Sequence, residues 1–288
     1  GHGDFTVHVQ PRSQNDILGN AVVAMKTNLR QLVSDLQNAR EKINEFNKQL
    51  EKTVTERTAQ LETVNKELEA FSYSVSHDLR APLRAISGYA AKLKEQYIQY
   101  LDPEALRLIH VIIAKSKMMG QLIDDLIALA STGQKELHMQ SVDMKKMAAL
   151  SVAACLEHEK EIKYKIIIDD IPSCKGDTNL LKQVWMNLID NAVKYSSRTK
   201  DPRIKISAEE DPLFYTYIIS DNGVGFDMQY YEKLFGVFQR LHNQDVYQGT
   251  GIGLALAKRI INKHYGEITA SSSPGNGATF YFTIPKIN

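Results

Sequence analysis

Apolar residues recur at alternating spacings of three and four along residues 16–80, a stretch without proline. This heptad pattern is typical of a helix that buries a narrow stripe against a partner helix. The stripe resumes at Leu61, eleven residues after Leu50, and this irregular spacing predicts altered supercoil winding near 53–60. We expect one long helix paired with a second copy of the chain; the alternative is an amphipathic helix packed on its own domain. The stripe consists of Val22, Met25, Leu29, Leu32, Leu36, Ala39, Ile43, Phe46, Leu50, Leu61, Val64, Leu68, Phe71 and Val75.

A second helical pattern covers residues 103–130 and begins with Pro103, which is favoured in a first turn. The short connection at 99–102 predicts an antiparallel hairpin, and two hairpins from two chains would form a four-helix bundle. Residues 131–140 contain Gly133 and several polar residues, and we interpret them as a linker.

Beyond residue 141 the pattern changes to short apolar runs alternating with helical segments. We expect helices layered on one mixed sheet, an α+β sandwich. The expected strands are 163–168, 203–208, 214–220, 268–272 and 279–284, with a hairpin turn at 273–277, and the expected helices are 144–158, 178–195 and 253–263.

Composition narrows the possible partners. The 35 basic and 34 acidic residues leave a formal charge of +1, so no strong field attracts nucleic acid or an anionic membrane. The two cysteines, Cys155 and Cys174, cannot form a multi-disulfide framework. The sequence has no apolar run of about 18 residues and no basic-then-apolar start, so we expect a soluble chain without nucleic-acid partners.

The first candidate for chemistry is His77, in the sequence 76–82 on the long helix. A neutral imidazole nitrogen is a competent nucleophile near pH 7, and a carboxylate bonded to the other nitrogen would fix the tautomer. Asp78 is the candidate for that carboxylate. Pro82 should bend the helix near His77 and give the imidazole room.

Three segments of the mixed domain form a second candidate site. Asn187, Asn191 and Lys194 lie at helical spacing in 187–195, where carboxamide oxygens can ligate Mg²⁺ and a lysine can meet phosphate; an exposed polar face would show the same spacing. Asp221 follows an apolar strand and precedes Gly223 and Gly225, so its carboxylate could accept from a base amino group.

The third segment is Gly249-Thr250-Gly251-Ile252-Gly253, which opens a helix whose N-terminus could bind phosphate, although many glycine turns are only turns. Residues 226–248, with Phe235 and Phe238, suit a mobile lid over a nucleotide.

Together these segments resemble the H, N, G1, F and G2 boxes of sensor histidine kinases, in the family's order, from residue 71 to the C-terminus. Residues 74–88 look most like the phytochrome-related subgroup. The resemblance implies a dimerisation and phosphoacceptor hairpin followed by an ATP-binding domain of the type shared with gyrase, MutL and a heat-shock chaperone. It further implies ATP and Mg²⁺ as cofactors, a homodimer, and a response-regulator receiver domain as the phosphoryl acceptor.

Roles carried over by motif are implied only by this resemblance. Asn191 would ligate Mg²⁺ with Asn187 nearby, Asp221 would bind the adenine amino group, and Lys194 the phosphates. Tyr195 would lie at the base or ribose, and Arg240 near the γ-phosphate. The remaining nucleotide-binding residues would be Gly223, Gly225, Gly249, Thr250, Gly251, Gly253 and Leu254. Ala81 replaces the threonine or asparagine that positions water for phosphatase activity in many relatives.

The N-terminus resembles the connector and second helix of a HAMP signal-relay domain at residues 3–7 and 15–20, and residues 56–58 resemble a signalling-helix linker. This implies the cytoplasmic portion of a bacterial inner-membrane receptor with sensor and transmembrane parts upstream. The expected domains are a partial HAMP domain (1–35), a coiled coil (36–70), the phosphoacceptor hairpin (71–131), a linker (132–142) and the ATP-binding domain (143–288). The alternatives are a gyrase- or MutL-class ATPase and a kinase-like scaffold without catalysis.

Overall fold

The computed structural model describes residues 17–132, 136–157, 162–242, 247 and 249–286. The chain divides into two units, residues 1–67 and 68–288. The described part of the first unit is helical throughout and belongs to α1 (Ile17–Tyr97), which continues into the second unit. The HAMP-like residues 3–7 and the start of 15–20 lie outside the described residues.

The heptad stripe of α1 is uncovered in the single chain. Leu36, Ile43 and Phe46 are 62%, 59% and 66% exposed. A helix of this length with an apolar stripe in water is stable only when another surface covers the stripe. No helix in the described part of the chain combines the length and the apolar character needed to cross a bilayer.

The hairpin consists of the end of α1, the short 3₁₀ helix η1 (Ile98–Tyr100) and α2 (Pro103–Ser131). Asp102 caps α2 by accepting from the Ala105 N–H at 2.6 Å, with Pro103 in the first turn as expected. Arg80 donates to Asp124 at 2.7 Å and so ties α1 to α2. Leu83, Ala90, Ile109 and Ile123 are buried in the hairpin, whereas a second set of apolar residues is exposed, among them Leu79, Ile86, Leu93, Leu108, Ile112 and Met119.

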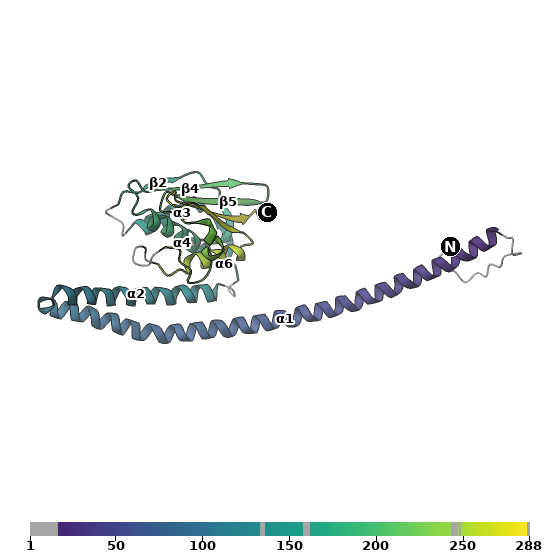
Figure 1. Cartoon of the computed structure of the whole chain (residues 1–288), viewed down its shortest axis with the longest axis horizontal. Helices are drawn as coiled ribbons and strands as arrows, with labels where there is room; N and C mark the ends of the chain where they lie inside the picture. Colours follow the sequence, from purple (N-terminus) through teal and green to yellow (C-terminus); the bar gives the residue numbers. More distant parts are fainter. Residues whose placement is uncertain (1–16, 133–135, 158–161, 243–246, 248, 287–288) are drawn as a thin grey trace. The chain divides into compact units, whose positions relative to one another are not determined.

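The rest of the second unit is an α+β domain built on a five-stranded mixed sheet of order β2-β4-β5-β7-β6. The strands are β2 (Lys165–Ile168), β4 (Arg203–Glu210), β5 (Phe214–Asp221), β6 (Ile268–Ser272) and β7 (Ala278–Pro285). Only the pair β2-β4 is parallel; the other pairs are antiparallel. The helices α3 (Met144–Leu156), α4 (Thr178–Ser196) and α6 (Gly253–Lys263) cover one face of this sheet (Figure 1).

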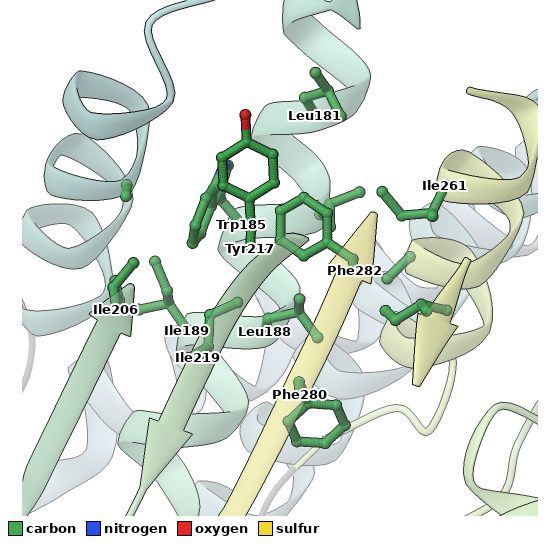
Figure 2. Close-up of a cluster of buried hydrophobic side chains, with 14 of the residues drawn as sticks. Leu181, Trp185, Leu188, Ile189, Ile206, Tyr217, Ile219, Ile261, Phe280 and Phe282 are labelled. Carbon is green, nitrogen blue, oxygen red and sulfur yellow. The ribbon is translucent and has the colours of Figure 1, made fainter. Parts of the chain in front are cut away.

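The core lies between this sheet face and α4. Trp185, Tyr217 and Phe282 are fully buried, with ring centroids 5.1 to 6.0 Å apart. Figure 2 shows these rings between α4 and the strands β5 and β7, with Leu188 and Ile189 beside them. Burial of such large apolar groups is the main force that fixes α4 on the sheet.

The expected fold class is confirmed: a helical part is followed by a sandwich of helices on one mixed sheet. Two strands were missed. β1 (Met139–Val142) and β3 (Cys174–Asp177) form a separate antiparallel pair. β1 therefore takes up the end of the expected linker, which was placed at 131–140 from composition and at 132–142 as a domain boundary. The expected helix 144–158 ends at Leu156, and the expected lid 226–248 contains η2 (Met228–Tyr230) and the short helix α5 (Tyr231–Leu234).

Candidate nucleotide site and phosphoacceptor

Helix α4 supplies the polar wall of the candidate site. Its N-terminus is capped by Asp177, whose carboxylate accepts from the N–H groups of Asn179 and Leu180. One face of the helix is buried in the core, while Asn187, Asn191 and Lys194 line a cavity of about 470 Å³. The sequence prediction that these three share a face is therefore confirmed.

Lys194 is poised for an anionic ligand. Its Nζ donates to Asn191 Oδ1 at 3.4 Å. Burial lowers the pKa of Lys194, and the nearby Asp190 carboxylate opposes this effect. Because a desolvated ammonium group gains most from a negative partner, a phosphate in this cavity would stabilise the charged lysine.

The first glycine turn follows the end of β5. The Asp221 carboxylate accepts from the Gly223 N–H at 2.8 Å and is also hydrogen-bonded to the Ala278 backbone. Burial raises the pKa of Asp221 to about 6 despite these bonds. A side chain at Gly223 would place Cβ 2.4 Å from the Tyr195 carbonyl oxygen, so only glycine lets this turn lie against the end of α4.

The second glycine turn opens α6 and lies against the polar face of α4. A Cβ at Gly253 would lie 2.7 Å from Asn187 Oδ1, and one at Gly249 would lie 2.8 Å from Lys194 Nζ. Gly251 has φ +72°, a left-handed conformation that favours glycine. Among the residues that the structure describes, no side chain caps the N-terminus of α6 at Ile252, and such an N-terminus favours a bound anion. Three segments far apart in the sequence thus meet around one space.

Arg240 shapes the segment that leads into this turn. Its guanidinium donates to the Gly249 carbonyl at 2.7 Å and to the Tyr247 carbonyl. The side chain also lines both cavities of the site. In this arrangement Arg240 supports the backbone of the loop, and its suggested place near a γ-phosphate stays a prediction.

A second, smaller cavity of about 60 Å³ adjoins the first, and five residues line both cavities: Tyr195, Leu234, Gln239, Arg240 and Leu254. Its walls are mainly apolar, and the partly buried Asp221 carboxylate lies among them. This arrangement suits a phosphorylated nucleoside. The polar cavity offers a lysine and a helix N-terminus for the phosphates, and the small apolar cavity beside it offers one carboxylate for the base. The other lining residues of this small cavity are Gly225, Phe226, Leu241, His242, Ala278 and Phe280.

Several of these lining residues were not predicted. Phe226, Leu234 and Phe280 are ordinary core-type residues whose role depends on long-range packing. His242 lies four positions after Phe238, the last residue of the F-box motif at 235–238, and could have been suspected from that place. Helix α2 also contributes: Gln121 and Asp125 line the polar cavity, and Thr250 Oγ1 donates to Asp125 Oδ2 at 2.6 Å.

His77 lies elsewhere, on α1 in the hairpin, and is not among the residues that line either cavity. Its side chain is 70% exposed, and its Nδ1 is 3.3 Å from Asp78 Oδ1. The helix runs through Pro82 without interruption. The imidazole is thus accessible, with the predicted carboxylate beside one ring nitrogen.

Two family models match the chain. The "His Kinase A (phospho-acceptor) domain" covers residues 67–135, and the "Histidine kinase-, DNA gyrase B-, and HSP90-like ATPase" covers residues 176–288. The first contains His77, and the second contains all three segments that meet at the cavities.

Curated relatives agree with these matches. Phytochrome-like protein Cph1 of Synechocystis sp. is 36% identical over 225 residues, which are 78% of this chain and 30% of that protein. Adaptive-response sensory kinase SasA of Thermosynechococcus vestitus is 34% identical over 222 residues, 73% of this chain and 58% of that protein. The chain therefore spans about 30% of the length of the phytochrome relatives that it matches.

Among solved structures, full-length ShkA in complex with AMPPNP superposes with a TM-score of 0.58, covering 75% of this chain and 45% of that chain. At 22% identity this likeness shows the fold alone.

Proposed function

Since the chain belongs to the sensor histidine kinase family, we propose that it transfers the γ-phosphoryl group of ATP to its own His77 and then to an aspartate of a response-regulator receiver domain. One observation carries the proposal. The polar face of α4, the Asp221 turn and the glycine turn before α6 line a polar cavity of about 470 Å³ and a small, mainly apolar cavity with one carboxylate. The same chain carries an exposed histidine with a neighbouring carboxylate.

The nucleotide would lie across the two cavities. Its base would enter the smaller one, where Asp221 can accept a hydrogen bond from an amino group and Tyr195 offers a ring at the boundary. Its phosphates would lie beside Lys194 and the N-terminus of α6, among Gly249, Thr250, Gly251, Gly253 and Leu254. Fixed donors of this kind stabilise phosphate charge without reorganisation.

The residues present fit a magnesium ion held jointly with phosphates. Among the described residues, no group of three or more His, Cys, Asp or Glu side chains could hold a metal. Mg²⁺ commonly keeps only one or two protein ligands and takes the rest from phosphate and water. The carboxamide oxygen of Asn191, with Asn187 one turn earlier, would be the protein ligand, and the bound ion would neutralise phosphate charge.

The neighbouring carboxylate prepares His77 as the nucleophile. When Nδ1 carries the proton and donates to Asp78, Nε2 keeps its lone pair. Attack of Nε2 on the γ-phosphorus forms the N–P bond while the bond to the β-phosphate oxygen breaks and ADP leaves with the electron pair. The Nδ1 proton is then available to the Asp78 carboxylate, which stabilises the positive charge on the ring.

The two sites must come together for this step. Because His77 lines neither cavity, we infer that the ATP-binding domain moves relative to the hairpin by hinging in the linker between α2 and β1. Signals that alter the winding of α1 near 53–60 would shift the population in which His77 is reachable.

Dimerisation is the second part of the proposal. The uncovered stripe of α1 and the exposed apolar residues of the hairpin together require a partner surface, and a second copy of the chain supplies a matching one. The receiver domain would dock beside the resulting bundle. The setting in a membrane receptor stays a prediction, because part of the HAMP-like sequence lies outside the described residues.

The test is incubation with γ-labelled ATP and Mg²⁺ of the chain, its His77→Gln variant and a matched control, His110→Gln. His110 is an exposed histidine on α2 of the same hairpin. We expect a label that is lost in acid and survives alkali in the parent and the control, and no label in His77→Gln. Label that persists in His77→Gln would move the acceptor elsewhere. ATP hydrolysis without label would favour the gyrase- or MutL-class alternative, and the absence of any turnover would favour a scaffold.

A further inference from the structure

Three rings gather where the lid segment meets the end of α4. The ring centroids of Tyr195 and His242 are 5.1 Å apart, those of Tyr195 and Tyr247 are 5.2 Å apart, and those of His242 and Tyr247 are 5.8 Å apart. We call these three residues the ring cluster. All three distances are in the range of favourable aromatic contacts, so the rings support one another.

Within the cluster, only Tyr195 and His242 line the small apolar cavity, on which Asp221 also borders. Tyr247 is 7% exposed and does not line this cavity, and the Arg198 guanidinium lies 5.6 Å from its ring centroid. The ring of His242 therefore contacts two other rings and also borders the space assigned to the base.

His242 also contacts a second lining residue of this cavity, Gly225. Its ring is hydrogen-bonded to the backbone of Gly225 in the first glycine turn. One side chain from the lid segment thus touches both the tyrosine at the end of α4 and the turn after β5. Burial lowers the pKa of His242, which favours the neutral ring, and the hydrogen bond to Gly225 opposes this effect. A neutral ring can pack against a base without a desolvation cost for charge.

We propose that His242 is a positioning residue for the nucleotide base. Its side chain holds Tyr195 and the Gly225 turn at the spacing that a purine ring requires. The proposal rests on the proposed function only in that the ligand is ATP. It assigns His242 to nucleotide affinity and leaves phosphoryl transfer to His77 unaffected once the site is filled.

The main test is the His242→Ala variant, with ATP binding measured by calorimetry and initial labelling rates measured over a range of ATP concentrations. Loss of one hydrogen bond and one ring contact should raise the Kd and KM for ATP about tenfold, while kcat stays within about twofold. His242→Phe keeps the ring and His242→Gln keeps a hydrogen-bonding group, so each should restore part of the affinity. His110→Ala serves as the matched control and should match the parent.

A probe without a base separates positioning from damage to the fold. Inorganic triphosphate occupies only the polar cavity, so its Kd should be the same in the parent and in His242→Ala. A parallel loss of triphosphate binding would overturn the proposal, as would an unchanged Kd for ATP or a fall in kcat without a rise in KM. Because binding is measured directly, tight ATP binding without label on His77 would refute the proposed function and leave this inference intact.

Discussion

Replacement of Asp221 by asparagine should make the ATP-binding domain more stable at neutral pH while it weakens nucleotide binding. The pKa of the Asp221 carboxyl is about 6 in the folded chain, against an ordinary value of 3.8, because burial penalises its charge. The unfolded chain releases this proton near pH 4 and the folded chain near pH 6. Stability is therefore lost as pH rises between these values, and the loss is complete above pH 6.

The magnitude follows from the difference of about two pH units. At about 1.4 kcal/mol per unit, the buried charge costs roughly 3 kcal/mol of unfolding free energy at pH 7.5. Asparagine carries no charge but keeps one acceptor oxygen for the N–H groups of Gly223 and Ala278, and loss of the second acceptor costs about 1 kcal/mol. We expect Asp221→Asn to be about 2 kcal/mol more stable than the parent at pH 7.5 and about 0.5 kcal/mol less stable at pH 4.

Trp185 provides the assay, because it is the only tryptophan in the sequence and is fully buried in the core of this domain. Denaturant unfolding followed by its fluorescence at several pH values gives the unfolding free energy of the parent and the variant. ATP binding to the variant should be weaker by about tenfold or more, since a hydrogen bond to a charged acceptor is lost. A variant that is equally destabilised at pH 4 and pH 7.5 would refute the reasoning.

Three further predictions concern other parts of the chain. Tyr265 is 79% exposed and has φ 60°, just after α6, where the Gly266 N–H donates to the Ile261 carbonyl. Because this left-handed conformation favours glycine, Tyr265→Gly should raise the unfolding free energy by about 1 kcal/mol in the Trp185 assay. Tyr265→Ala should not raise it. Asp125→Asn removes a negative charge from the polar cavity and should tighten ATP binding about threefold to tenfold at low salt. Asp124→Asn is the control, because the Asp124 carboxylate bonds to Arg80 outside the cavity, and it should leave ATP binding unchanged. Equal effects of the two variants would count against a role for Asp125. Ile43→Asp places a charge on the α1 stripe and should weaken self-association at least about tenfold, as measured by sedimentation equilibrium. Lys42→Asp changes a residue beside the stripe and should alter self-association little. Similar effects of the two variants would argue against a helix–helix contact at Ile43.

Periodicity predicted the long elements because each carries one continuous apolar face. Helix α6 begins and ends where its pattern indicated, from Gly253 to Lys263, and strands β5 and β6 differ from expectation by at most one residue. The pair β1 and β3 was missed because each strand has only four residues and no clear alternation. Their pairing depends on contacts between segments more than 30 residues apart, as between Met139 and Asp177.

The candidate site divides in the same way. Asn187, Asn191 and Lys194 could be placed on one face from spacing alone, and the family motifs pointed to Asp221 and the glycine turns. The apolar lining, the ring cluster and the approach of Asp125 could not be predicted, because they arise where separate segments pack. Phe226 and Phe280 have no local signal that distinguishes a cavity wall from ordinary core.

The most direct measurement is the location of the phosphoryl group on the chain after incubation with ATP and Mg²⁺. Digestion and tandem mass spectrometry at neutral to alkaline pH, which preserves phosphohistidine, would identify the modified residue. The proposed mechanism predicts a phosphoryl group on His77, and its transfer to a receiver-domain aspartate when a response regulator is added. Phosphorylation at another residue, or ATP consumption with His77 unmodified, would contradict it.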